Sequence, residues 1–287
     1  MTHKFHYLFE KIETILFALI KYYFYICAII NKITTLKMII TFLNNKGGVG
    51  KTTTAVNVAH ALTIEGKRVL LIDLDRQRNA SFIMGHDDSS EANIFDALAG
   101  KVDIPIYTHD QIADLHYSPA GRVDIEEILL LQRIGRESKL KKLLDPIKKI
   151  YDYILIDCPP SLGMISLNAL VASDKLVIPI QLEPFAFLGT SEIASFFSDV
   201  KKEINNQLEI LGYLKTLYDS RLSQTRDIEE LLSQHVNKNK IFNTTIRKNV
   251  ALSEASNMQK TIFEYAPEST GAKNYRDFTK EIIQLTK

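Results

Sequence analysis

The feature that most limits how this chain can fold is a glycine-rich segment, NKGGVGKTT, at residues 45–53. It lies between an apolar run at residues 38–43 and a helix-like stretch that begins at Lys51. Glycines let the backbone approach an anion closely, and the N-terminal end of a helix favours negative charge. A strand, a glycine-rich turn and a helix in this order predict a phosphate-binding loop; a turn with incidental lysines is the competing interpretation.

The loop carries the groups that a bound nucleotide requires. Lys51 would reach the β- and γ-phosphates, and the Thr52 hydroxyl would complete the shell of a Mg²⁺ that bridges them. The strict phosphate-loop pattern has glycine where this chain has Asn45, and a second lysine, Lys46, precedes the first glycine. The residues expected to bind the nucleotide are Gly47, Gly48, Val49, Gly50, Lys51, Thr52 and Thr53.

Two further apolar runs end in aspartate. Residues 68–73 lead to Asp73 and Asp75, and residues 153–157 end in Asp157. Carboxylates at the carboxyl ends of parallel strands lie in the crevice where ligands bind. We therefore expect Asp157 to hold Mg²⁺ opposite the Thr52 hydroxyl, directly or through water, whereas the other two acids form part of the site or cap the next turn.

The loop resembles the deviant Walker A signature, KGGxGK[ST], of the partition and cell-division ATPases, a family that includes ParA, MinD and the nitrogenase iron protein. The resemblance implies that Lys46 crosses a dimer interface to the phosphates held by the partner subunit. It also implies that Asp75 positions the attacking water and that Asp73 supports the metal and phosphate region. The chain is thus expected to be an ATPase with Lys46, Lys51 and Asp75 as its catalytic residues.

The segment after the second apolar run departs from the family pattern. The usual DxDPQGN reads DLDRQRN here, so that Arg76 and Arg78 replace the proline and the glycine. Three interpretations of these arginines remain open: they slow hydrolysis, they bind phosphate, or they face solvent.

A long string at residues 151–163, YDYILIDCPPSLG, is similar to the partition ATPases almost residue for residue. An iron–sulfur cluster shared across a dimer would need two cysteines per chain near the nucleotide, and only Cys158 is there. The segment FNTTIRKNVALSE at residues 242–254 also resembles the family, which favours its partition branch.

The resemblance further implies that an ATP-bound dimer binds DNA without sequence preference. Arg221 matches one arginine of the family's DNA-binding patch, but the second position is Ala251. Arg247 and Lys248 lie just upstream and are expected to supply the positive charge instead. Beyond residue 37 the chain has 30 basic and 32 acidic residues, so DNA binding requires a local patch.

Apolar runs alternate with helical repeats as far as the C-terminus, and 46% of the residues are hydrophobic. This pattern predicts an α/β fold, a doubly wound and mostly parallel sheet flanked by helices, in one domain over residues 38–287. Beyond the runs already described, strands are expected at 115–118, 176–181 and 208–217, helices at 93–98, 136–150, 188–204, 227–236 and 272–285, and an irregular segment at 241–246.

Residues 1–37 differ from the rest of the chain. They contain a 17-residue apolar run, 14–30, which Lys21 interrupts. A membrane-spanning helix needs roughly 20 apolar residues without a central charge, and no cleavage site for a signal peptide follows. We interpret the segment as an upstream in-frame extension, a mis-start, because proteins of this family begin near Met38; a hydrophobic anchor is the alternative.

The sequence as a whole predicts a cytoplasmic, nucleoid-associated partition ATPase that uses ATP and Mg²⁺. It would form a homodimer with ATP, bind DNA non-specifically, respond to a ParB-like centromere-binding partner, and have no stable membrane association. The main alternative is a MinD-like, membrane-associated ATPase that places the division site or flagella, but the final residues lack the basic amphipathic tail of that branch. A ligase of cofactor synthesis would share the fold without the lysine at position 46.

Overall fold

The computed structural model describes residues 21–22, 37–87, 92–123, 125, 129, 134–183, 186–219, 221 and 223–287. Contacts divide the chain into two units, one of Met1–Leu36 with Lys287 and one of Lys37–Thr286. The fold described below is that of the second unit. The interpretation of residues 1–37 as an extension falls almost wholly outside the described residues.

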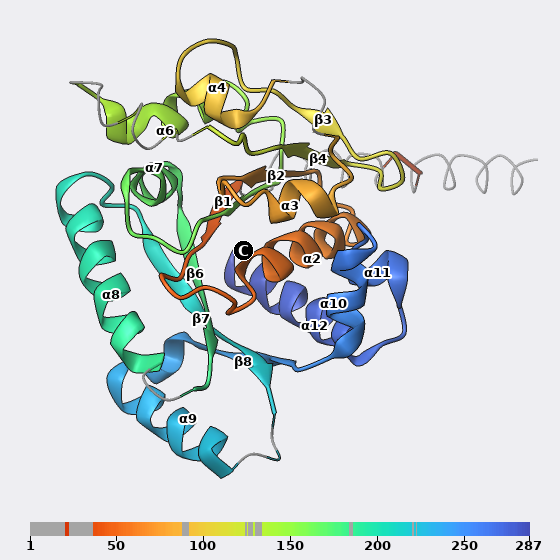
Figure 1. The fold of residues 1–287 in the computed structure, drawn as a ribbon, viewed down its shortest axis with the longest axis vertical. Helices are drawn as coiled ribbons and strands as arrows, with labels where there is room; N and C mark the ends of the chain where they lie inside the picture. The colour runs from red at the N-terminus through yellow and green to blue at the C-terminus, as the bar shows by residue number, and fades with distance from the viewer. Residues whose placement is uncertain are drawn as a thin grey trace, which may run out of the picture. The chain divides into compact units, whose positions relative to one another are not determined.

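The second unit is built on an eight-stranded sheet in the order β3-β4-β2-β5-β1-β6-β7-β8 (Figure 1). Neighbouring strands run parallel except β3 and β4, which are antiparallel. This confirms the predicted fold class. The strands are β1 (Met38–Phe42), β2 (Val69–Asp73), β3 (Tyr107–Thr108), β4 (Leu115–Ser118), β5 (Tyr153–Asp157), β6 (Lys175–Gln181), β7 (Glu209–Tyr218) and β8 (Ile241–Arg247).

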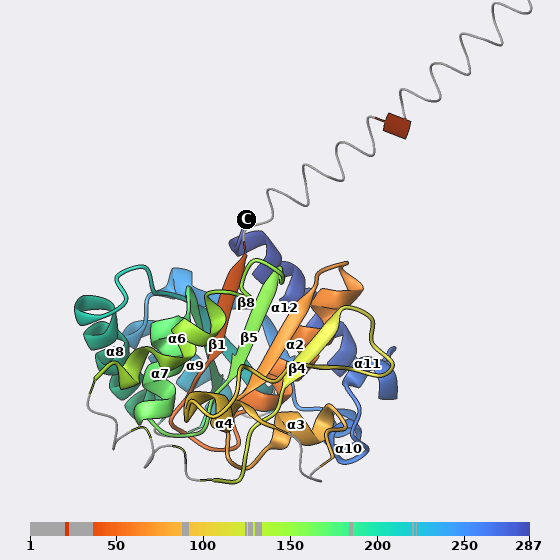
Figure 2. The same cartoon turned by 90° about the horizontal axis from the view of Figure 1, so that it is seen from above.

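Helices cover both faces of the sheet, so that two apolar cores form (Figures 1 and 2). One face packs against α2 (Lys51–Ile64), α3 (Asn79–Ile83), α10 (Val250–Asn257), α11 (Ile262–Tyr265) and α12 (Thr270–Leu285). The other packs against α4 (Ile94–Leu98), α6 (Lys139–Leu144), α7 (Met164–Ala172), α8 (Ala186–Glu203) and α9 (Ser223–His235). Two short 3₁₀ helices, η1 (Arg136–Ser138) and η2 (Lys238–Lys240), complete the connections.

The central strands are buried along their whole length. Every residue of β1, β2 and β5 is buried, which explains why these strands read as continuous apolar runs rather than as alternating ones. The helix after β1 packs on one face of the sheet, and α7, which leads to β6, packs on the other. The order of the strands therefore reverses at β1, and the crevice at its carboxyl end is the expected ligand site.

Two expectations for secondary structure were wrong. Residues 241–246, expected to be irregular, belong to strand β8, which pairs with β7 in a register that shifts twice. Its apolar residues do not alternate regularly because it is an edge strand against an irregular partner. The helix expected at 136–150 is shorter. The 3₁₀ helix η1 leads directly into α6, which ends at Leu144, and turns follow.

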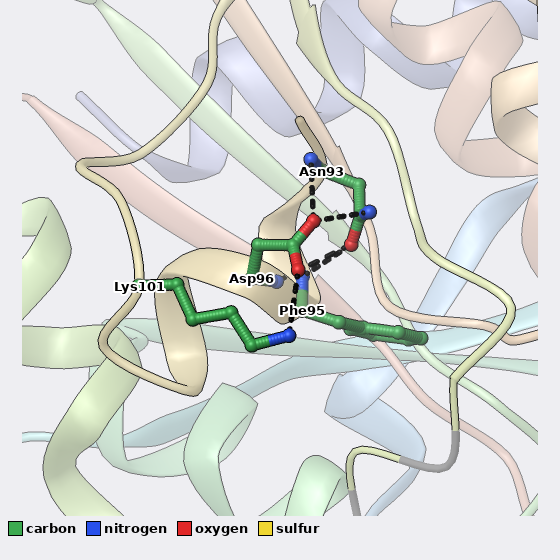
Figure 3. Close-up of polar contacts among 4 residues, drawn as sticks. All are labelled: Asn93, Phe95, Asp96 and Lys101. Carbon is green, nitrogen blue, oxygen red and sulfur yellow. Dashed lines mark hydrogen bonds and ion pairs between the residues drawn. The ribbon is translucent and has the colours of Figure 1, made fainter. Parts of the chain in front are cut away.

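A capping box fixes the start of α4 (Figure 3). The Asn93 side chain accepts hydrogen bonds from the backbone N–H groups of Phe95 and Asp96, and the Asp96 carboxylate accepts from the Asn93 N–H group. Lys101 reaches the same carboxylate at 3.3 Å. These bonds satisfy donors that a helix start otherwise leaves open, so they define where this short helix begins.

In the part of the chain that the structure describes, no helix is both long and apolar enough to cross a membrane.

Candidate nucleotide-binding site

The loop between β1 and α2 has the conformation of an anion cradle. Gly48 and Gly50 have φ values of 76° and 82°, in the left-handed region that side chains disfavour. Gly50 is the N-cap of α2, and among the described residues no side chain caps the start of this helix. The first N–H groups of α2 are therefore left for a ligand, and the positive end of the helix faces the same place.

Neighbouring strands hold this loop from behind. Asn44 accepts a hydrogen bond from the Lys46 N–H group at 2.9 Å and donates to the Pro179 carbonyl, in β6, at 2.7 Å. The Thr216 hydroxyl, in β7, donates to the Val49 carbonyl at 2.8 Å. These hydrogen bonds from β6 and β7 therefore hold the loop in its shape.

Lys51 points back into the loop. Its side chain is buried, with 6% of the residue exposed, and Nζ donates to the Lys46 carbonyl at 3.0 Å. Burial lowers the pKa of Lys51, and the nearby carboxylates of Asp157 and Asp75 act against this effect. The Lys51 ammonium group thus lies inside the curve of the loop. The negative charges of Asp157 and Asp75 act on it there and favour its charged form.

Lys46 lies at the edge of the same loop and is 44% exposed at its side chain. Its Nζ forms an ion pair with Glu183 at 2.5 Å, and the Gln181 amide donates to the same carboxylate. The side chain is therefore directed towards the segment that follows β6 of its own chain.

Asp73 and Asp157 are adjacent in the sheet, at the ends of β2 and β5. Both are buried, yet their surroundings differ. Asp73 accepts hydrogen bonds from the Ser81 hydroxyl at 2.7 Å, the Ser81 N–H group at 2.8 Å and the Asp75 N–H group at 3.0 Å. Burial nevertheless raises the pKa of Asp73 to about 6, because these bonds offset only part of its cost.

Asp157 is only 1% exposed, and neither carboxylate oxygen has a hydrogen-bond partner among the described residues. Burial and then the neighbouring Asp73 raise its pKa well above the usual value, and the nearby Thr52 hydroxyl counteracts the rise. An orphaned carboxylate beside a hydroxyl is the donor set that a divalent cation fits.

Asp75 is buried at the mouth of this site, and its side chain accepts from the Gln77 N–H group at 2.9 Å. Together with the loop residues Gly47, Gly48, Gly50, Lys51, Thr52 and Thr53 it lines a cavity of about 460 Å³. Of the other residues predicted for the nucleotide and metal sites, Val49 is buried, Lys46 lies at the edge of the loop, and Asp73 and Asp157 lie side by side at the ends of their strands, where their charges act on Asp75 and Lys51. Asn44, Thr216 and Ser81, which support these residues, carry no motif that would have revealed them.

The residues predicted to bind DNA lie elsewhere, where β7 and β8 end. Tyr218 pairs with Arg247 across these strands, and the Lys248 N–H group donates to the Tyr218 carbonyl. Arg221 is 86% exposed at its side chain and pairs with Asp219, Nη2 lying 2.6 Å from the carboxylate. Lys248 lies close enough to contribute to lowering the pKa of Asp219, after the hydrogen bonds and charge of Arg221.

Comparison with known proteins agrees with this geometry. A family model described as an AAA domain matches residues 37–210. The chain is 42% identical to the sporulation initiation inhibitor protein Soj of Bacillus subtilis, over 85% of this chain and 97% of that protein. It is 37% identical to the chromosome-partitioning ATPase Soj of Treponema pallidum, over 85% of this chain and 96% of the relative.

Solved structures share the fold. One is cobyrinic acid a,c-diamide synthase from Mycobacterium smegmatis with a bound ATP analogue and magnesium, with a TM-score of 0.75 and 33% identity over 86% of this chain and 94% of that one. Another is the cell division ATPase MinD of Pyrococcus furiosus, with a TM-score of 0.72 and 27% identity over 87% of this chain and 100% of that one.

Proposed function

Because the chain belongs to the ParA/Soj-type partition ATPases of the deviant Walker A family, we propose that it binds and hydrolyses ATP to segregate a plasmid or a chromosome. The observation that carries the proposal is the cradle itself. A glycine-rich loop and a buried lysine line one cavity, and the orphaned carboxylate of Asp157 lies close enough to that lysine to act on its pKa. The loop would supply backbone N–H donors to a triphosphate, the lysine would supply positive charge, and the carboxylate would hold a metal ion.

The metal site would be formed by Thr52 and Asp157. When bound, Mg²⁺ would neutralise charge on the phosphates and orient them. The described residues contain no group of three or more His, Cys, Asp or Glu side chains able to hold a metal. This agrees with a Mg²⁺ that takes many of its ligands from phosphate and water. Asp73, also predicted for the metal site, has its oxygens occupied, and we propose that it positions the segment carrying Asp75.

Asp75 is the candidate for positioning the attacking water. Its side chain is fixed by the Gln77 N–H group, and it lines the same cavity as Lys51. A carboxylate that orients a water near a phosphate aids attack by placing the nucleophile in line. Lys51 would hold the phosphates from the side of the loop, where its charge opposes the charge that builds up during transfer.

We further propose that ATP closes a homodimer in which Lys46 reaches the phosphates of the partner subunit. The half-exposed position of Lys46 supports this role, because a lysine at the edge of the loop is available to a second chain once its ion pair with Glu183 opens. A ParB-like partner would then stimulate hydrolysis and release the dimer from DNA, which would make the protein nucleoid-associated in the cytoplasm.

The cationic surface formed by Arg221, Arg247 and Lys248 is the candidate for non-specific DNA binding. Its three cations are exposed and lie at one end of neighbouring strands. Asp219 removes part of this charge, so a phosphate contact by Arg221 must compete with its ion pair to Asp219. We expect weak binding by one chain and useful binding only when two chains present the surface together.

Two other functions have specific support. The likeness to MinD favours a membrane-associated ATPase, and the likeness to the diamide synthase favours an ATP-dependent ligase. The partition function is better supported because relatives of the partition class reach 37% to 42% identity over nearly their whole length.

The test is retention of the full chain on non-specific DNA and on anionic liposomes, side by side, with ATP, with ADP, and with a Lys51→Ala control. Retention on DNA that needs ATP and disappears in the control is the expected result. ATP-dependent retention on liposomes alone would overturn the proposal in favour of the MinD-like function. The apolar N-terminal run does not confuse the test, since any binding by it would not depend on the nucleotide.

A further inference from the structure

The end of β7 connects the nucleotide cradle to the cationic surface. Thr216 is buried, with 2% of the residue exposed, and its hydroxyl donates to the Val49 carbonyl of the phosphate loop. The same side chain packs against the N-cap of α2, since a Cβ added at Gly50 would lie 3.9 Å from it. Only Leu217 separates this buried anchor from Tyr218, to which the end of β8 is bonded.

The backbone of Leu217 is in a conformation that leucine disfavours. Its φ of 49° lies in the left-handed region, which a bulky side chain enters only at a loss of free energy. Leu217 is also 36% exposed, so burial of its side chain offsets little of this cost. Such a conformation persists only where the contacts on both sides of the residue determine it.

The strand pairing changes at the same residue. β7 lies between β6 and β8 (Figure 1). It pairs with β6 as far as Thr216, and its register with β8 shifts between Lys215 and Tyr218. Leu217 therefore lies where one ladder ends and the other is irregular, so a change of its φ disturbs few hydrogen bonds between strands.

The residues after Leu217 hold the cationic surface in place. The Lys248 N–H group donates to the Tyr218 carbonyl at 3.1 Å, which ties the end of β8 to this segment. Asp219 accepts hydrogen bonds from the Arg221 guanidinium group at both carboxylate oxygens, at 2.9 and 2.6 Å. A change of φ at Leu217 would shift both attachments, and with them the cations of this surface.

We propose that Leu217 is the hinge through which the nucleotide controls the cationic surface. Its left-handed backbone is supported on one side by Thr216 and the phosphate loop, and on the other by β8. A nucleotide that orders the loop strengthens the first support, so it favours the left-handed backbone and the arrangement of cations that binds DNA. The proposal rests on the ATPase and DNA-binding functions proposed above and adds the element that couples them.

Two substitutions at Leu217 change the cost of the left-handed backbone in opposite directions. Leu217→Gly removes the cost, whereas Leu217→Ile increases it because a β-branched side chain tolerates this region least. The ATP concentration for half-maximal retention of the full chain on non-specific DNA should therefore fall by about tenfold in Leu217→Gly and rise several-fold in Leu217→Ile. Shifts in the same direction, or no shift, would overturn the proposal.

The support from Thr216 has a test of its own. Thr216→Val keeps the branched shape but removes the hydroxyl that donates to the Val49 carbonyl, so ATP-dependent retention on DNA should weaken. Adding Leu217→Gly should restore the retention, because the left-handed backbone then needs no support from the loop. Thermal melting checks that both variants are folded. A folded double variant that does not recover would contradict the hinge.

The matched control is Gln259→Gly, which removes the same backbone cost at another left-handed residue, with φ of 53°, after the end of α10. It should leave the ATP requirement unchanged. An effect as large as that of Leu217→Gly would mean that any relief of strain acts in this way, which would overturn the proposal.

The affinity for ATP, measured by calorimetry without DNA, separates the hinge from DNA binding. Because coupling between sites is reciprocal, ATP should bind more tightly to Leu217→Gly and more weakly to Leu217→Ile than to the unaltered chain. These shifts in a chain that is not retained on DNA would support the hinge and contradict only the DNA-binding function. Equal ATP affinities in a chain that is retained on DNA would overturn the hinge alone.

Discussion

The nucleotide cradle and the cationic surface formed by Arg221, Arg247 and Lys248 are built in opposite ways. In the cradle, the functional side chains are largely buried and held by strands far away in sequence, as the bond from Thr216 to the Val49 carbonyl illustrates. On the cationic surface, the side chains are exposed, and the ion pair of Arg221 is with a residue two positions away.

The difference explains why one region keeps the family pattern and the other does not. A residue such as Asp157 occupies a place where burial, neighbours and geometry exclude most substitutes. A cation on an exposed surface acts through its charge, so a neighbouring lysine or arginine can replace it. We therefore expect an alanine at position 251 to be tolerated better than a change at Lys51.

The largest expected effect is on ATP hydrolysis, and it distinguishes the nucleotide cradle from the cationic surface. Lys51→Ala should lower ATP hydrolysis by at least about 100-fold, because it removes a preorganised charge from the phosphates. Lys248→Gln should leave hydrolysis in the absence of DNA unchanged and weaken DNA binding instead. Phosphate release and DNA retention, measured on both variants, check the separation. A loss of basal hydrolysis in Lys248→Gln would break it.

Within the cradle, the two adjacent aspartates should respond differently to loss of charge. Asp157→Asn should stabilise the ligand-free protein more than Asp73→Asn does, by at least about 1 kcal/mol, because the hydrogen bonds to Asp73 already offset part of its burial. Chemical denaturation without nucleotide or Mg²⁺ measures both. An equal or opposite effect would contradict the assignment of Asp157 as the orphaned metal ligand.

The raised pKa values of the two aspartates also predict how the stability of the protein changes with pH. An acid with a raised pKa in the folded protein holds its proton more tightly than in the unfolded chain, so stability falls as pH rises from the unfolded value to the folded one. For Asp73 that window runs from the ordinary pKa of an aspartate, 3.8, to about 6. The gain from Asp157→Asn should accordingly be near zero at pH 4 and larger at pH 8, at roughly 1.4 kcal/mol for each pKa unit.

The cationic surface should improve when the missing arginine is restored. Ala251 lies in the first turn of α10, next to the capping residue Asn249, and is partly buried. Ala251→Arg should add one phosphate contact, which raises DNA affinity several-fold at low salt and steepens the salt dependence by about one unit of slope. Ala251→Gln is the control of similar size without charge. An unchanged slope would place the DNA contacts elsewhere.

The smallest effect is expected at the ion pair between Lys46 and Glu183. Glu183→Gln should lower the ATP concentration needed for dimer formation by no more than about fivefold, because a half-exposed pair contributes only about 0–1 kcal/mol. Light scattering across an ATP titration measures the shift. A higher ATP requirement would mean that Glu183 assists the dimer rather than retaining Lys46.

The sequence predicted the parts of this molecule that short-range pattern controls. Three apolar runs became buried strands, and the glycine-rich turn became a cradle because glycine alone adopts the backbone at Gly48 and Gly50 without strain. It did not predict β8, since an edge strand with a shifting register has no regular alternation.

Contacts between segments that are distant in the chain could not be predicted from the sequence either. Nothing in the sequence places Arg122 beside Arg78, or Ser81 on the carboxylate of Asp73, because both depend on how loops more than a few residues apart pack. Arg76 and Arg78 were noticed as departures from the family pattern, yet the cavity that both residues line exists only in the folded chain.

The most direct test of the central claim, that the cradle is the site of ATP hydrolysis, is a paired measurement on Asp75→Ala. The variant and the unaltered chain are compared for Mg-ATP affinity and for phosphate release in the presence of non-specific DNA. The account predicts that affinity changes by less than about threefold while the rate of release falls by about 100-fold or more. Release at an unchanged rate would contradict the account, because the water would then be positioned by another group.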